Sequence, residues 1–275
     1  MDAGYLGFLL GQPNVTPHSL LSMFFLGLMR ITPIVAFAPF LGGKLPGSVK
    51  IGLSVAITLV MLPNIVFTTH EVIVFNSTFV GYALKEIFIG VILAILCTVP
   101  FYIANMSGTL IDFMRGSQSL MVQDPLLQTQ VSSLGLLYNY ILIVIFFEIN
   151  GPTIFLNGLF DSYQVLPADG LFSRYFFYAS NPIWKLIMEI ATKTLSIAIQ
   201  LAAPSLIAVL MTEVFLGIAN RLAPQVQIAF LGMSIKSLVG LSLLYAAWFY
   251  ILKEMAKQSL DWITLINKVI YFFRA

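Results

Sequence analysis

Long apolar stretches, separated by short polar ones, run along most of the 275-residue chain. A helix of about 20 apolar residues spans the hydrocarbon of a bilayer, so stretches of this length predict helices that cross or enter a membrane. Their expected bounds are Leu20 to Leu41, Val49 to Phe67, Phe79 to Ala104, Val131 to Ile149, Ile183 to Ala219 and Ile228 to Leu252. The pattern predicts an all-α, membrane-associated protein of helical hairpins with about six long apolar segments.

Prolines predict bends in some of these segments. Pro33 and Pro39 are expected to kink the first one, and Pro100 lies near the end of the third. The fifth segment is longer than the roughly 20 residues that one span needs, so we expect a bend or a helix break at Pro204.

Two further regions have a different character. Residues 150–182 carry turn signals such as Asp169-Gly170 between many aromatic residues, and we expect a mixed interfacial region there. Residues 253–275 alternate charged with apolar side chains and predict an amphipathic C-terminal tail that lies on a surface. No long hydrophilic linker divides the rest, so residues 1–252 are expected to form a single unit.

The apolar pattern is interrupted in the middle of the chain, at residues 105–130. Glycines loosen a helix, an Asp-Pro step tends to end one, and methionine is flexible enough to seal an irregular opening. The residues concerned are Met106, Gly108, Met114, Gly116, Met121, Asp124 and Pro125. We expect a conformable seal, and ordinary core packing is the alternative for the same methionines.

Composition supports membrane association. The chain has 59% hydrophobic residues, 9% charged residues and a mean hydropathy of +0.94, whereas soluble domains have roughly 25% charged residues. A net charge of +2 without a long basic run argues against nucleic acid as a partner. The start of the chain lacks the basic segment of a secretory signal, so we expect the first apolar segments to stay in the mature protein.

Charged residues nevertheless lie within or beside the apolar segments. A charge facing lipid costs about 2.5 to 3.5 kcal/mol at a helix centre, so these side chains must face protein or water. They are Arg30, Lys85, Glu86, Glu148, Lys185, Glu189, Lys193, Glu213, Arg221 and Lys236. The spacing of Lys185, Glu189 and Lys193 predicts a ladder on one helix face, and that of Glu213 and Arg221 predicts a pair on one face.

The positive charges do not define one topology. Six spans would place residues 42–50 and 212–227 on one side and the tail on the other, and both sides carry Lys or Arg. We therefore expect some apolar hairpins to be covered by neighbouring subunits instead of crossing the bilayer.

Residues that carry chemistry are few. The sequence has two histidines, His18 and His70, outside the long apolar segments, which argues against a metal site or a histidine-based triad. Asp112 and Asp124 are candidate acids or bases, but a polar loop acquires aspartates readily. The sequence predicts neither an enzyme nor a cofactor.

The order of Gly, Pro, Asn and charged residues between and within the apolar segments resembles that of the FliR/SctT family of type III export proteins. The residues that carry this resemblance are Arg30, Pro39, Pro46, Glu86 to Gly90, Gly108, Gly116, Asp124-Pro125, Asn150-Gly151, Asp161 to Tyr163, Pro167, Glu213 to Gln225 and Ile235 to Ser237. Ser162-Tyr163 and Ile235 to Ser237 are more similar to the injectisome branch than to the flagellar branch.

The resemblance implies a subunit of an export gate at the base of the secretion system, a multi-pass protein of the bacterial inner membrane. Its implied partners are FliP/SctR-like and FliQ/SctS-like subunits, a FlhB/SctU-like switch protein and exported unfolded proteins. By position, residues 105–125 are similar to the plug that closes the pore, with Phe113 as the aromatic residue of that range. The implied interface or intramembrane charges are Arg30, Glu86, Lys185, Glu189, Lys193, Glu213, Arg221 and Lys236.

Another class of function fits the same apolar pattern. A secondary transporter of a small solute would have broken helices at Pro100 and Pro204 around a site at the bilayer midplane. A transporter should bind solute when purified alone, whereas a gate subunit should be unstable without its partners.

Overall fold

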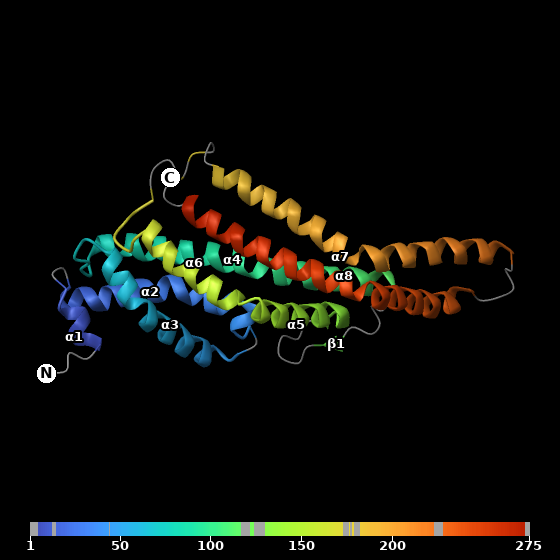
Figure 1. Ribbon diagram of the computed structural model, residues 1–275, viewed down its shortest axis with the longest axis horizontal. Coiled ribbons are helices and arrows are strands. Elements are labelled where there is room, and N and C mark those ends of the chain that lie inside the picture. The colour runs from blue at the N-terminus through green and yellow to red at the C-terminus, as the bar shows by residue number, and fades with distance from the viewer. Residues whose placement is uncertain are drawn as a thin grey trace. The chain divides into compact units, whose positions relative to one another are not determined.

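The chain is almost entirely helical, as predicted (Figure 1). The computed structural model describes residues 5–12, 15–43, 45–116, 122–123, 130–172, 176, 178, 182–222 and 228–272. The helices are α1 Tyr5–Leu10, α2 Pro17–Phe37, the 3₁₀ helix η1 Pro39–Leu41, α3 Gly47–Thr68, α4 Ser77–Met114, α5 Ser133–Glu148, α6 Gly151–Val165, α7 Pro182–Leu222 and α8 Ile228–Phe272. Two strands of two residues, β1 Val122–Gln123 and β2 Gln130–Val131, pair antiparallel.

The number of long apolar helices agrees with the sequence pattern. Within the described residues, α2, α3, α4, α7 and α8 are each long and apolar enough to cross a membrane. Helices α5 and α6 are together long and apolar enough as well, with a bend of 72° between them, and make a sixth candidate for a membrane span. Asn150 forms this bend in a left-handed conformation at φ 57°.

The prolines act differently from one segment to the next. Helix α2 ends just before Pro39, which starts η1, because an X-Pro step disfavours helical backbone at the preceding residue. Helices α4 and α7 instead continue through Pro100 and Pro204. No break occurs at Pro204, although α7 changes direction near its middle (Figure 1).

Two boundaries differ from the expected ones. Helix α4 continues past Ala104 to Met114, and α8 continues past Leu252 to Phe272. Residues 150–182, expected to be a mixed region, contain the 15-residue helix α6. Its buried residues Phe155, Leu159 and Tyr163 follow the i, i+4, i+8 spacing of a helix face, which the turn signals of the region obscured.

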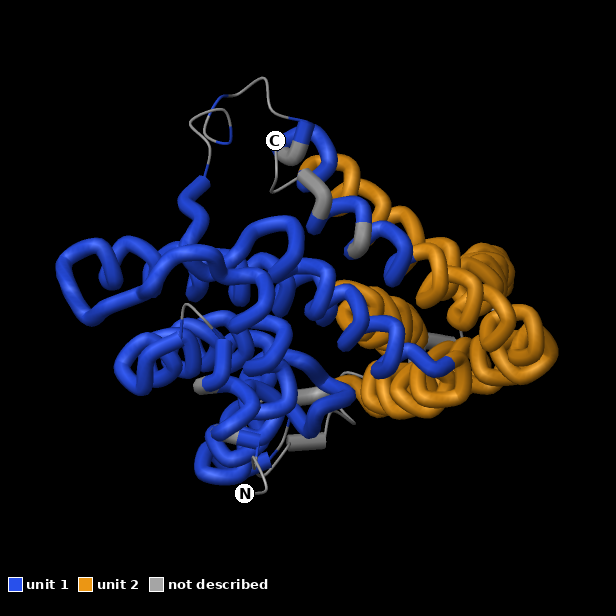
Figure 2. The backbone as a smooth tube through the Cα atoms, turned by 60° about the vertical axis from the view of Figure 1, so that its left-hand side comes forward, with its two compact units in different colours: residues 1–98, 150–187, 262–275 blue, residues 99–149, 188–261 orange. Residues whose placement is uncertain are grey.

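The chain forms two compact units, each assembled from segments distant in sequence (Figure 2). Unit 1 comprises residues 1–98, 150–187 and 262–275, and unit 2 comprises residues 99–149 and 188–261. In unit 1, α2 packs against α3 at Gly27, where an added Cβ would lie 2.8 Å from Ile65. In unit 2, α7 meets α8, and the hydroxyl of Ser205 donates to the carbonyl of Gly240 at 3.2 Å.

The end of α8 combines buried apolar residues with exposed charged residues such as Lys268. Trp262, Ile263 and Ile266 are buried in unit 1, and the indole Nε1 of Trp262 donates to the carbonyl of Leu96 in α4 at 2.8 Å. The apolar face of the tail therefore packs against the chain itself.

Candidate functional site

A buried charge cluster lies in the core of unit 1. Arg30 of α2 donates from Nε to Glu86 Oε2 at 2.5 Å and from Nη2 to Glu86 Oε1 at 2.9 Å, a bidentate pair. Lys85 Nζ lies 2.7 Å from Glu86 Oε1. All three side chains are almost completely buried.

Further hydrogen bonds satisfy the two cations. Arg30 donates to Ser162 Oγ at 3.0 Å and to the carbonyl of Leu166 at 2.9 Å. Lys85 Nζ donates to the carbonyls of Pro167 and Ala168 at 2.7 and 3.1 Å. The cluster thus joins α2, α4, α6 and the loop after α6, and its full hydrogen bonding makes the burial of charge tolerable.

Two other contacts shape this cluster. The guanidinium carbon of Arg30 lies 3.8 Å from the centre of the Tyr163 ring. At Gly90 an added Cβ would lie 2.3 Å from the carbonyl oxygen of Arg30, so only glycine lets α4 approach α2 this closely. Arg30 and Glu86 were expected at a subunit interface or within the membrane, and the structure places their contacts inside one chain.

Other charges predicted from the sequence remain exposed. Glu189 and Lys193 pair along α7 at 2.6 Å, with about half of each side chain exposed. Lys185 is also exposed on this helix. The predicted i, i+4 contact is therefore present between Glu189 and Lys193, at a surface of the isolated chain.

The expected pair of Glu213 with Arg221 is wrong. Glu213 of α7 forms an ion pair with Lys236 of α8, and Arg221 is exposed at the end of α7. Spacing along one helix suggested Arg221, whereas the antiparallel neighbour supplies the partner. Along the chain, Glu213 and Lys236 lie nearly the same number of residues from the connection between α7 and α8. In an antiparallel helix pair such residues face each other, and this spacing is the signal in the sequence that could have identified Lys236.

The predicted seal is only partly irregular. Met106, Gly108, Phe113 and Met114 belong to the last turns of α4, and Gly116 follows with φ +79°. Phe113 is 57% exposed, and Met106 is also exposed. Met121, Asp124 and Pro125 lie outside the described residues.

Asp112 anchors both ends of this interruption in unit 2. Its Oδ1 accepts from Arg115 Nη2 at 2.5 Å, and its Oδ2 accepts from the hydroxyl of Ser132 at 2.5 Å and from the amide of Leu134 at 3.0 Å. Ser132 is itself the N-cap of α5. The carboxylate, a candidate acid or base from sequence, therefore joins the end of α4 to the start of α5.

Gly108 has a packing role that the sequence did not reveal. An added Cβ would lie 2.5 Å from backbone atoms of Leu134 and Gly135, so α4 and α5 approach each other too closely for a side chain there. The absence of a Cβ, and not flexibility, is what this position needs.

Among the described residues, no group of three or more His, Cys, Asp or Glu side chains is placed to hold a metal ion. The predicted residues that the structure does bring together form buried ion pairs, as at Arg30 and Glu86, and a helix-cap contact, as at Asp112 and Ser132. Others lie at the partly exposed end of α4.

The sequence matches the family model of bacterial export proteins, family 1, over residues 21–261. The chain belongs to this family. It is 30% identical over 255 residues to Yop proteins translocation protein T of Yersinia pestis, which covers 92% of this chain and 93% of that protein. It is also 30% identical over 220 residues to surface presentation of antigens protein SpaR of Shigella sonnei, with 78% and 81% covered. The flagellar biosynthetic protein FliR of Escherichia coli (strain K12) is 26% identical over 233 residues, with 83% and 85% covered.

This family, the FliR/SctT family, supplies components of the export apparatus of type III secretion and flagellar export. The two injectisome proteins are more similar to this chain than the flagellar protein is. Together with the long apolar helices, membership describes a multi-pass membrane protein that works with other export subunits.

Proposed function

We propose that the chain is a structural and conducting subunit of the type III export gate, through which unfolded proteins cross the bacterial inner membrane. The observation that carries the proposal is the interruption between α4 and α5, which Asp112 anchors at both ends. A segment held at both ends is suited to closing a pore.

The proposed plug starts at the exposed end of α4. Phe113, Met114 and Gly116 lead into it, and Met121, Asp124 and Pro125 belong to it by sequence. Met106 lies two turns earlier on α4, and Gly108 fixes that part of the helix against α5. Methionine side chains repack easily, so they suit a closure that is tight to ions and yields to protein.

Partners of the FliP/SctR, FliQ/SctS and FlhB/SctU types would cover faces that the isolated chain leaves open. Helices α7 and α8 expose large apolar residues together with the charged Glu189, Lys193 and Arg221. A face that mixes such charges with apolar side chains is costly in lipid, whereas a protein partner can satisfy both.

Conductance of purified gate complexes in planar bilayers tests this function. Replacing Met114 and Met121 by Gly should raise ion conductance of the closed complex, because the seal loses volume. Replacing both by Leu is the matched control and should change conductance little, since volume and apolarity are nearly retained. An intact complex that stays electrically silent with both glycines would place the seal elsewhere.

The transporter alternative expects broken helices at Pro100 and Pro204. The continuity of α4 and α7 through both residues favours the gate subunit over it.

A further inference from the structure

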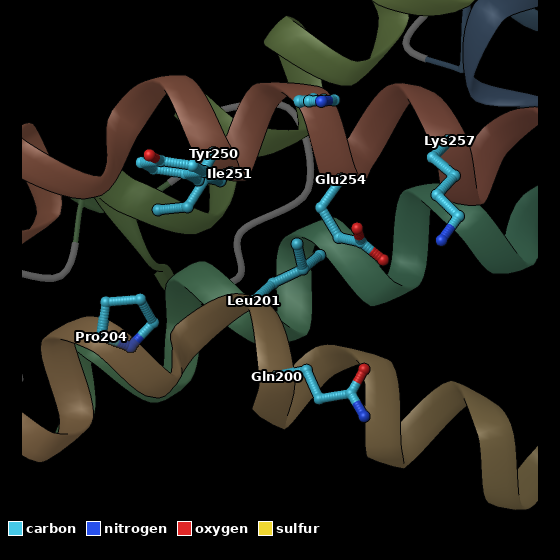
Figure 3. A pocket seen from close by; sticks show the side chains of 8 residues that line it. Gln200, Leu201, Pro204, Tyr250, Ile251, Glu254 and Lys257 are labelled. Atoms are coloured by element: carbon cyan, nitrogen blue, oxygen red, sulfur yellow. The ribbon is translucent and has the colours of Figure 1, made fainter.

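A cavity of about 600 Å³ lies between α7 and α8 within unit 2, beside the proline of α7 (Figure 3). Its lining residues are Gln200, Leu201, Pro204, Tyr250, Ile251, Lys253, Glu254 and Lys257. Figure 3 shows Glu254 and Lys257 projecting from α8 toward the α7 side, where Gln200 and Pro204 lie. The proposed export function uses none of these residues.

The lining has an apolar part and a charged part. Leu201 and Ile251 are buried and form an apolar wall with Pro204. Lys253 and Lys257 are exposed, and their i, i+4 spacing places both on one face of α8. A ligand of this cavity therefore needs an apolar portion joined to a polar group.

The charge of the polar part favours an anion. Glu254 accepts a hydrogen bond from Gln258 Nε2 at 2.6 Å, so part of its acceptor capacity is already used. Two lysines against one carboxylate leave a positive charge, while Glu254 can still accept from a hydroxyl. The exposed side-chain amide of Gln200, which also lines the cavity, offers a further acceptor to a ligand hydroxyl.

The position of the cavity along the helices identifies the kind of anion. Between the Glu213–Lys236 pair and Lys253, residues 237–252 of α8 carry no charge, and neither do residues 194–212 of α7. At 1.5 Å per residue these stretches measure about 24 and 28 Å, close to the roughly 30 Å of bilayer hydrocarbon. Lys253 and Lys257 thus lie just beyond one end of a bilayer-sized apolar band, at the level of phospholipid headgroups.

We propose that this cavity binds an acidic phospholipid, with its phosphate at Lys253 and Lys257 and an acyl chain along Leu201, Pro204 and Ile251. A glycerol headgroup adds hydroxyls that Glu254 and the side-chain amide oxygen of Gln200 can accept from. The site is independent of the plug, so it stands whether or not residues 113–125 close a pore.

Native mass spectrometry of the full chain, purified in mild detergent with its co-expressed partner subunits, tests the site. Phosphatidylglycerol, phosphatidylcholine and inorganic phosphate are titrated separately. We expect the unmodified complex to retain phosphatidylglycerol in preference to phosphatidylcholine. The double variant Lys253→Gln/Lys257→Gln should retain phosphatidylglycerol about 10- to 30-fold more weakly, the effect of removing two basic contacts at a membrane surface.

The control variant, Lys185→Gln/Lys268→Gln, removes the same charge at exposed positions outside the cavity and should retain phosphatidylglycerol normally. Equal retention in both double variants overturns the site. If inorganic phosphate displaces the lipid and binds as well as phosphatidylglycerol does, the acyl chains add nothing to binding. The cavity is then a site for free anions, and the proposal is overturned. The proposal is also overturned if the Lys253→Gln/Lys257→Gln variant fails to assemble with its partners while the recovered chain retains phosphatidylglycerol normally. The lysines would then bind an acidic segment of a partner.

A variant that blocks the apolar wall keeps the lipid proposal falsifiable even if the lysine variant folds poorly. Leu201→Trp would fill the space assigned to the acyl chain while leaving both lysines in place. Phosphatidylglycerol retention should fall, and weak binding of inorganic phosphate should not. Unchanged lipid retention in this variant would overturn the assignment of the acyl chain to this wall.

Discussion

Glu86 shows how much of this fold depends on single charged side chains. It lies between two cations, Arg30 and Lys85, in a core that excludes water. A buried ion pair adds little net stability over an apolar replacement, but removal of one partner leaves a buried charge without compensation. The cluster therefore works as an all-or-none junction of α2, α4 and α6.

Replacing Glu86 by Gln should lower the stability of unit 1 by about 3 to 5 kcal/mol, because Arg30 and Lys85 would remain buried without their anion. Thermal unfolding of purified complexes, followed by circular dichroism, measures this effect. The matched control is Glu71→Gln, which removes the same charge from an exposed side chain of unit 1 and should leave the melting curve unchanged. Equal loss in both variants would mean that burial is not what makes Glu86 important.

The sequence was enough to identify which charged residues are important, but it did not show which residues they contact. The cost of a charge in an apolar segment depends on the side chain alone, so Arg30 and Glu86 stood out at once. Their contact joins residues 56 positions apart and depends on how α2 and α4 cross. The same limit explains Glu213, whose partner on its own helix was plausible and whose actual partner, Lys236, lies on the next one.

At the scale of elements, polar residues inside α4 concealed its length. Asn105, Ser107 and Thr109 suggested an end, yet the hydroxyl of Thr109 donates to the carbonyl of Asn105 at 2.8 Å within the helix. Such back-bonding lets a polar residue remain helical. Apolar periodicity predicted that the long helices exist, whereas their ends depended on contacts such as that of Asp112 with Ser132.

Gly108→Ala should weaken the packing of α4 on α5, because its Cβ would meet the backbone of Leu134 and Gly135 at 2.5 Å. We expect a loss of about 1 to 3 kcal/mol, as for other overpacked contacts. Gly81→Ala is the control on the same helix, where nothing lies within 4 Å of an added Cβ. It should be neutral or stabilising by up to about 1 kcal/mol, since alanine favours a helix. Thermal unfolding of both variants decides, and an unaffected Gly108→Ala would mean that α5 can shift away at no cost.

The whole molecule leaves much apolar surface to other molecules. Met211 and Phe215 of α7 are 68% and 70% exposed, and they flank Glu213, which pairs with Lys236. Lipid could cover the two apolar side chains, but it covers the neighbouring charges poorly. A partner subunit therefore fits this face better than lipid does.

Expressed alone, the chain should aggregate in mild detergent, and co-expression with partner subunits should give a monodisperse complex, because partners cover the exposed faces. Size-exclusion chromatography measures both outcomes. A monodisperse helical monomer of the isolated chain would contradict this expectation.

Polar substitution of the same face separates partner from lipid as its cover. Met211→Ser/Phe215→Ser should make the isolated chain aggregate less and should reduce its co-purification with partner subunits. Both effects are expected because the apolar surface that causes aggregation is the same surface that binds the partner. Met211→Leu/Phe215→Leu keeps the face apolar and should change neither result. If lipid covered this face instead, the serine variant would insert poorly into membranes, while any inserted protein would still assemble. Normal assembly of the inserted serine variant would therefore remove Met211 and Phe215 from the partner interface.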